Sequence, residues 1–124
     1  MRIFLNKWFQ RFASKEGIDD ATLCDAVSRS DRGQIDANLG GGVIKQRIAR
    51  LGEGRSGGYR TIILYRESDR AFFVYGYAKS ERENITKAEL NGFRELAKQM
   101  LNYDDAQLLS AVQNETLREM ICHE

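Results

Sequence analysis

Hydrophobic positions recur at helical spacing in the first part of the chain. The segment EGIDDATLCDAVSR has the pattern of a helix, with Asp19 as its N-cap and Leu23, Ala26 and Val27 on its apolar face. A short apolar start at residues 3–5 and a helical turn around Trp8 precede it. The segment DANLGGG then ends this unit, because three consecutive glycines destabilise regular structure.

From Val43 the hydrophobic period changes to two. The runs VIKQRIA, YRTIILYR and RAFFVYGYAK are rich in β-branched and aromatic residues, and each is bounded by Gly, Ser or Asp. We therefore expect three successive strands. The connections LGEGRSGG and ESD are short, which predicts an antiparallel meander.

Helical spacing returns in ENITKAELNGFRELAKQML, where Thr86 and Glu89 have the spacing of a capping box. YDDAQLLSAVQ predicts a further helix that begins at Asp104 or Asp105, and the remaining residues are open to two readings, a frayed end or a docking tail. The predicted fold class is α+β, with a small antiparallel sheet of three or four strands flanked by helices. We expect one domain over residues 1–124, with the sheet at about 43–80 and the C-terminal helices and acidic tail at about 85–124.

The formal net charge of +1 hides an uneven distribution. Residues 43–82 hold nine Lys/Arg against four acids, whereas residues 101–124 hold five acids against one arginine. Such a basic middle indicates a polyanion-binding surface, and the acidic tail is a candidate to lie over it. Ordinary solvated charge is the alternative reading.

Composition also excludes several classes of protein. No apolar run is long enough for a membrane span or a signal peptide, so we expect a cytoplasmic protein without a membrane partner. Cys24 and Cys122 are far apart and outside any CxxC motif, and we expect both to be free thiols. No carboxylate cluster has the spacing of metal ligands, so we expect neither metal nor cofactor.

The cations of the middle segment have a spacing that suits a phosphodiester. In a strand, Lys45 and Arg47 share a face and lie about 7 Å apart, close to the spacing of phosphates along a nucleic acid. Arg60 begins the next predicted strand, and Lys79 and Arg82 follow the third. A meander would bring these five cations to one patch of the sheet.

This patch has the residue types that cleavage of RNA by its own 2′-hydroxyl requires. Arg47 and Arg60 suit the stabilisation of phosphate charge, because guanidinium binds two oxygens at once. A lysine transfers protons when neighbouring cations make it release them more readily, so Lys45 is the acid–base candidate. A histidine pair is excluded, since His123 is the only histidine.

Each assignment has a structural alternative. Lys45 and Arg47 are also typical of an exposed edge strand, and Arg60 could pair with Glu53 or Glu67. Lys79 and Arg82 could be plain surface charge. Tyrosines such as Tyr59 and Tyr77 are more often core residues than base-stacking platforms, and Gly57–Gly58 has the composition of a hairpin turn that needs positive φ.

The residues from VIKQRIARLGEGRSGGYRTIILYR to YAKSERENI, with ELNGFRELAKQML, resemble the RelE/ParE-like toxins of bacterial type II toxin–antitoxin modules, in particular the HigB-related group. The resemblance is strongest over residues 39–101, and SGGYR is its most specific element. It implies an α+β toxin that cuts mRNA in the ribosomal A site. It also implies a neighbouring antitoxin with a helix-turn-helix domain, through which alone the complex would bind operator DNA.

The resemblance also implies roles for individual residues. Lys45 and Arg47 match the basic pair that serves proton transfer and charge stabilisation, Arg60 matches the phosphate-binding arginine, and Lys79 matches the basic end of the next strand. The sequence departs from the family pattern at two positions, where Ser80 replaces an arginine and Thr86 a catalytic tyrosine. Candidates to replace the missing groups are Arg82 for the cation and Tyr59 or Tyr77 for the ring.

The leading hypothesis is a ribosome-dependent mRNA endoribonuclease toxin. Lys45, Arg47 and Arg60 are its candidate catalytic residues, and Tyr59, Lys79 and Arg82 its candidate RNA-binding residues. Two alternatives stay open: a ParE-like toxin that inhibits DNA gyrase by binding, and an interaction or regulatory module without catalysis.

Overall fold

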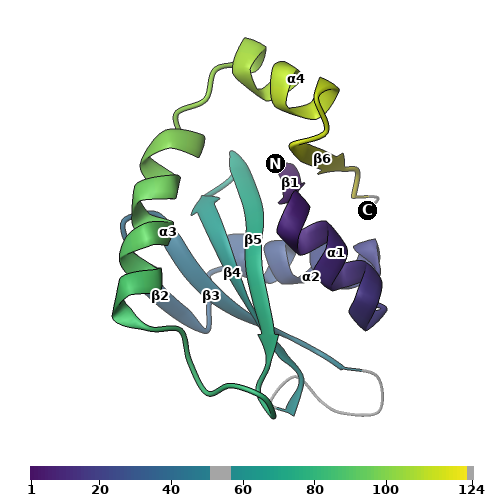
Figure 1. Ribbon diagram of the computed structural model, residues 1–124, viewed down its shortest axis with the longest axis vertical. Coiled ribbons are helices and arrows are strands. Elements are labelled where there is room, and N and C mark those ends of the chain that lie inside the picture. The colour runs from purple at the N-terminus through teal and green to yellow at the C-terminus, as the bar shows by residue number, and fades with distance from the viewer. Residues whose placement is uncertain (51–56, 123–124) are drawn as a thin grey trace.

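Six strands form one mixed sheet, in the order β2-β3-β4-β5-β1-β6 (Figure 1). The computed structural model describes residues 1–50 and 57–122, so most of the expected turn LGEGRSGG lies outside the described residues. The elements in chain order are β1 (Arg2–Asn6), α1 (Lys7–Glu16), α2 (Asp20–Asp31), β2 (Ala37–Gly40), β3 (Val43–Ile48), β4 (Tyr59–Arg66), β5 (Arg70–Ala78), α3 (Lys87–Met100), α4 (Asp105–Gln113) and β6 (Leu117–Met120).

The α+β class is confirmed, and β3, β4 and β5 form the expected antiparallel meander. The sheet is larger than the three or four strands expected, because β1 pairs parallel with β5 and β6 adds to β1 at the edge. The reading of DANLGGG as the end of regular structure was wrong. Residues 37–40 form β2, and Gly40, Gly41 and Gly42 all have positive φ, which lets the chain turn back into β3.

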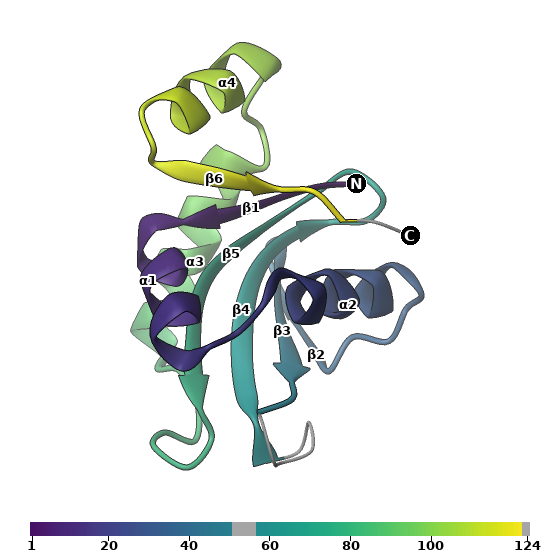
Figure 2. The same ribbon diagram turned by 90° about the vertical axis from the view of Figure 1, so that its right-hand side faces the viewer.

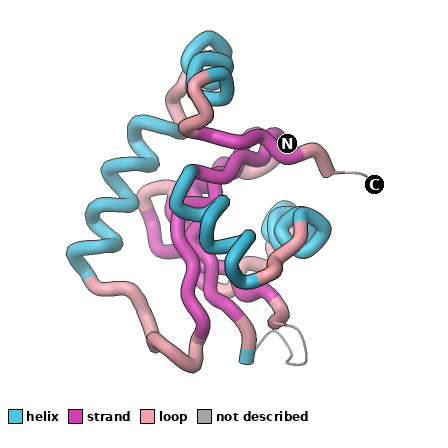
Figure 3. The backbone as a smooth tube through the Cα atoms, turned by 45° about the vertical axis from the view of Figure 1, so that its right-hand side comes forward, coloured by secondary structure: helices cyan, strands magenta, loops and turns pink. Residues whose placement is uncertain are grey.

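Helices cover both faces of the sheet (Figures 1 and 3). α3 packs over one face, where Ala97 and Met100 join a core cluster with Val43 and Leu64. α1 and α2 lie on the other face, and in Figure 2 the strands curve around α2. Because side chains alternate along a strand, each of β3 and β4 contributes to two separate cores.

The predicted helix starts are confirmed. Asp19 caps α2 by accepting from the backbone N–H of Thr22 at 2.9 Å. Thr86 and Glu89 form the expected capping box at α3, and Asp104 caps α4. These signals are local, and they hold because each satisfies backbone donors that the first turn of a helix leaves without partners.

Gln46 fixes the register of β3 against α2. Its side chain is fully buried on the α2 side, and its amide nitrogen donates to the carbonyl oxygens of Ala26 (3.1 Å) and Gln34 (2.9 Å) and to the hydroxyl of Ser30 (3.1 Å). Its amide oxygen accepts from the backbone of Asp36 at 3.0 Å. Lys45 and Arg47 must therefore point to the opposite face.

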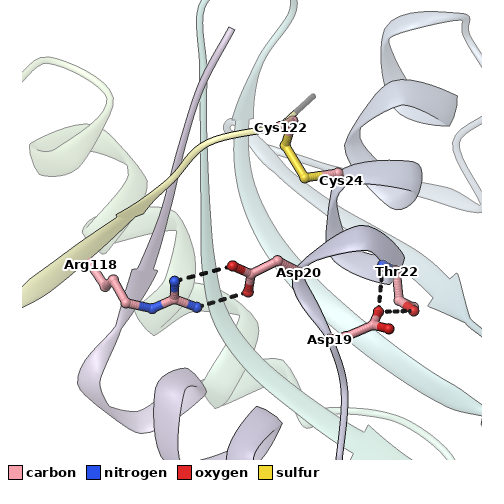
Figure 4. The surroundings of a disulfide bond; sticks show 6 residues. All are labelled: Asp19, Asp20, Thr22, Cys24, Arg118 and Cys122. Atoms are coloured by element: carbon pink, nitrogen blue, oxygen red, sulfur yellow. Dashed lines mark hydrogen bonds and ion pairs between the residues drawn. A yellow bond between two sulfur atoms is a disulfide. The ribbon is translucent and has the colours of Figure 1, made fainter. Parts of the chain in front are cut away.

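Cys24 and Cys122 form a disulfide, which corrects the expectation of two free thiols (Figure 4). Their Cα atoms lie 5.8 Å apart although the residues are 98 positions apart in the chain. The bond ties α2 to the end of the chain after β6. Beside it, Arg118 of β6 donates to both carboxylate oxygens of Asp20, at 3.0 and 3.3 Å, which reinforces the same connection (Figure 4).

Loss of this disulfide should destabilise the protein. Because the bond closes a loop of 98 residues, Cys24→Ser should lower the free energy of unfolding by about 2–4 kcal/mol, measured by urea denaturation without reductant. Reduced wild type should show the same loss, while reductant should leave Cys24→Ser unchanged. Full alkylation of both cysteines in unfolded, unreduced protein would contradict the bond.

Candidate nucleic-acid interface

The three candidate catalytic residues lie in two rows across the α3 side of the sheet, near the end where β3 leads towards β4. In one row Arg47 of β3 pairs with Arg60 of β4, which in turn pairs with Tyr77 of β5. In the next row Lys45, Ile62 and Tyr75 are paired in the same way. Side chains directly opposite each other on paired strands are near neighbours, so the register gathers Lys45, Arg47 and Arg60 on one face.

Lys45 and Arg47 differ in exposure and partners. Lys45 is half-buried, and its ammonium donates to the side-chain oxygen of Asn84 at 3.3 Å. Arg47 is exposed, and its guanidinium lies 3.8 Å from a carboxylate oxygen of Asp36, a separation at which a surface ion pair contributes little. Both cations are thus held near the surface, where a phosphate can reach them.

The backbone at Arg47 is held firmly by side chains from other elements. Arg29 of α2 is only 6% exposed and donates to the carbonyl oxygen of Arg47 at 2.7 Å, while its Nε pairs with Asp25 at 2.9 Å. The backbone N–H of Arg47 donates to Asp36. The exposed guanidinium therefore extends from a fixed point.

Arg60 lies at the centre of the first row and is 6% exposed. Its position between Arg47 and Tyr77 places a buried guanidinium beside an exposed one. A buried arginine interacts more strongly with a phosphate than an exposed one, because solvent screens it less. The alternative partner Glu53 lies outside the described residues.

Arg82 is held by Glu89 of α3. Its guanidinium forms hydrogen bonds with both carboxylate oxygens of Glu89, donates to the Tyr75 hydroxyl at 2.9 Å, and lies 5.8 Å from the ring centre of Tyr77. Its Nε also donates to the carbonyl oxygen of Asn84 at 2.8 Å. These contacts order the segment between β5 and α3 next to Lys45.

The Arg82 guanidinium, through its hydrogen bonds, lowers the pKa of the Glu89 carboxyl to about 2. Glu89 is therefore ionised at neutral pH, and it neutralises much of the charge of Arg82. Arg82 then contributes less to binding a phosphate than the sequence suggested, as long as it stays on Glu89. Lys79, by contrast, is exposed at the end of β5.

Tyr59 does not lie on this face, and the expectation that it binds RNA there is corrected. It is 3% exposed in the core on the α1 side, where its ring meets the edge of Phe12 and its hydroxyl donates to Glu16 at 3.1 Å. It precedes Arg60 directly in a strand, so alternation sends the two side chains to opposite faces.

Sequence reasoning missed the roles of Asn84 and Gly58. Asn84 contacts Lys45 from a loop, and no local pattern predicted that contact.

Gly58 was expected to supply positive φ, but its φ is not positive. A Cβ atom at this position would overlap the carbonyl oxygen of Ile48, so glycine is required here because two backbones approach closely. This approach brings the start of β4, and with it Arg60, against β3.

The acidic C-terminal segment pairs with other cations. Glu119 binds Arg2 through two hydrogen bonds of 2.9 Å, and Asp105 lies 3.7 Å from Arg2. β6 runs along β1 at the far edge of the sheet from β3 (Figure 1). This placement does not support the hypothesis that the tail covers Lys45, Arg47 and Arg60.

Among residues 1–50 and 57–122, no group of three or more His, Cys, Asp and Glu side chains could hold a metal ion. No helix of this part of the chain is long and apolar enough to cross a membrane.

An α+β domain that presents three clustered cations on one sheet face belongs to the class of proteins suited to a polyanionic ligand. The family comparison narrows this class. The sequence model of one protein family, the RelE toxin of the RelE/RelB toxin–antitoxin system, matches residues 1–120. The chain therefore belongs to the RelE toxin family. It is the toxin of a toxin–antitoxin system, and its family implies a cognate antitoxin. No curated protein gives a significant match.

The Arg82–Glu89 pair predicts an acid-resistant carboxylate. In an NMR titration the Glu89 carboxyl should titrate with a pKa of about 2, and in Arg82→Gln its pKa should return towards the ordinary value of about 4.3. Because the folded-state pKa is depressed, the pair stabilises the protein above pH of about 4.3, and this stabilisation is lost as the pH falls towards 2. An ordinary pKa in wild type would contradict the pairing.

Proposed function

We propose that this toxin is a metal-independent endoribonuclease that cleaves mRNA on the ribosome and thereby inhibits translation. The observation that carries the proposal is the register that sets Arg47 and Arg60 opposite each other, with Lys45 in the adjacent row. Membership of the RelE toxin family supports the same activity.

In the proposed reaction a 2′-hydroxyl of the mRNA loses its proton and its oxygen attacks the adjacent phosphorus. The bond to the 5′-oxygen breaks, the leaving oxygen takes up a proton, and a 2′,3′-cyclic phosphate remains. Lys45 is the proposed acid–base group, since the residue is half-buried and its ammonium is oriented by Asn84. Arg47 and Arg60 stabilise the charge that builds on the phosphate oxygens.

Lys79 and Arg82 are the proposed backbone-positioning groups of the same site. Lys79 is exposed and suits contact with a flanking phosphate, whereas Arg82 must first exchange Glu89 for a phosphate oxygen. Ser80 and Thr86 leave the site without the arginine and tyrosine of the family pattern, and Thr86 instead caps α3. We infer that other residues of this chain supply those functions.

The proposed partners are the ribosome, its mRNA and an antitoxin with a helix-turn-helix domain, through which the complex would bind operator DNA. A toxin that acts on ribosomes works in the cytoplasm, and the proposed location follows from that target. No cofactor enters the proposed reaction.

Removal of the acid–base candidate should abolish toxicity. When the chain is induced without its antitoxin, wild type should arrest growth and create new 5′ ends inside translated codons. Lys45→Ala should reduce cleavage on programmed ribosomes by about 100-fold or more, and Arg60→Ala by a similar factor. Mapping of mRNA ends and single-turnover rates measure both effects.

Arg66→Ala is the matched control, because Arg66 is a cation at the opposite end of the same strand, where it pairs with Asp69 at 3.1 Å. It should cleave mRNA as wild type does. Growth arrest with DNA damage signalling and intact mRNA would contradict the proposal and favour gyrase inhibition. Induction without growth arrest would favour a module without catalysis.

A further inference from the structure

Tyr77 has a buried hydroxyl for which the described part of the chain offers no hydrogen-bond partner. The residue is 5% exposed. Three other tyrosines differ in this respect, since the hydroxyls of Tyr59, Tyr65 and Tyr75 each have a partner. A buried hydroxyl without a partner destabilises the protein that carries it, so its presence calls for an explanation.

The hydroxyl lies among the cations of the candidate site. Tyr77 pairs directly with Arg60 across β4 and β5, and the Arg82 guanidinium lies over its ring at 5.8 Å. Burial raises the pKa of the Tyr77 hydroxyl above its ordinary value, and the charges of Arg60 and Arg82 offset only part of that rise. At neutral pH the group therefore keeps its proton and is a hydrogen-bond donor.

We propose that the Tyr77 hydroxyl donates a hydrogen bond to a non-bridging oxygen of an RNA phosphate that is bound by Arg60 and Arg82. This inference rests on the proposed function, and it makes Tyr77 a catalytic residue of the same site. The phosphate supplies the acceptor that the hydroxyl lacks. It reaches the hydroxyl when Arg82 turns from the Glu89 carboxylate to a phosphate oxygen, which exchanges one oxyanion for another.

The variant Tyr77→Phe, which removes only the hydroxyl oxygen, distinguishes a phosphate contact from a purely structural role of Tyr77. If Tyr77 only fills space, Tyr77→Phe keeps the ring, loses no hydrogen bond and leaves cleavage unchanged. If Tyr77 donates to the phosphate, the same variant keeps or gains stability but loses RNA affinity and cleavage rate. A donor to developing negative charge contributes more in the transition state than in the bound state.

Tyr65→Phe is the matched control, because its hydroxyl donates to Asp31 on the other side of the sheet and takes no part in the site. Three quantities are measured for both variants. These are the urea midpoint, the affinity for a 2′-O-methyl RNA oligonucleotide, which cannot be cleaved, and kcat for cleavage on programmed ribosomes.

We expect Tyr77→Phe to unfold at a urea concentration no lower than that of wild type, to bind the oligonucleotide about fivefold more weakly, and to lose about 10- to 100-fold in kcat. Tyr65→Phe should show the reverse, a lower urea midpoint with unchanged affinity and kcat. A kcat for Tyr77→Phe within twofold of an active wild type would overturn the inference.

Failure of the proposed function can be told from failure of this inference. If wild type cleaves no RNA, the endoribonuclease proposal fails, and the oligonucleotide affinity decides the role of Tyr77. A weaker affinity of Tyr77→Phe at unchanged stability would then support a phosphate contact. Equal affinities of Tyr77→Phe and wild type would overturn it.

Discussion

The buried amide of Gln46 is the constraint on which the candidate site depends. It satisfies three acceptors and one donor between α2, β3 and the segment that joins α2 to β2. A shift of β3 by one residue would leave these groups unpaired. Each buried group without a partner would lower the stability of the fold by about 1–3 kcal/mol. It would also turn Lys45 or Arg47 into the core, where an uncompensated charge is far more costly. The cations on the α3 side are thus a consequence of a polar contact on the other side.

Two sets of cations among the described residues differ in how far carboxylates neutralise them. Arg2, Arg82 and Arg118 bind carboxylates through two hydrogen bonds each, and Arg29 joins α2 to β3, so their charges hold elements of the fold together. Lys45 has a neutral amide oxygen as its partner, and the ion pair of Arg47 spans 3.8 Å. The acidic C-terminal segment supplies a carboxylate to the first set, because Glu119 binds Arg2. Lys45 and Arg47 therefore keep more of their charge than the three arginines that are bound to carboxylates.

Much of the fold could be predicted from the sequence, because its signals are local. The caps at Asp19, Thr86 and Asp104 and the alternation in β3, β4 and β5 were predicted. The pairing of β1 with β5 and of β6 with β1 joins segments far apart in the chain, and local periodicity has no information about such contacts. The disulfide between Cys24 and Cys122 was missed for the same reason.

The candidate site was predicted in part. Alternation alone places Lys45 and Arg47 on one face, and the meander brings Arg60 beside them. The same alternation excludes Tyr59, its neighbour in the chain, and should have been applied to it. Tyr77 needed the register of β4 with β5, including the irregularity after Ile62, and such an irregularity leaves no clear mark in a sequence.

The central claim is that the face set by Gln46 binds the phosphate backbone of RNA. The most direct test is the salt dependence of binding to a single-stranded 2′-O-methyl RNA. It is measured for wild type, for the double variant Lys45→Ala/Arg47→Ala, and for a control double variant. The control, Arg66→Ala/Lys98→Ala, removes the same charge elsewhere on the protein. In the first variant the slope of log affinity against log salt should become less steep by about 1.4, because each lost phosphate contact changes it by about 0.7. In the control variant the slope should not change. Equal slopes in both variants and wild type would contradict the account.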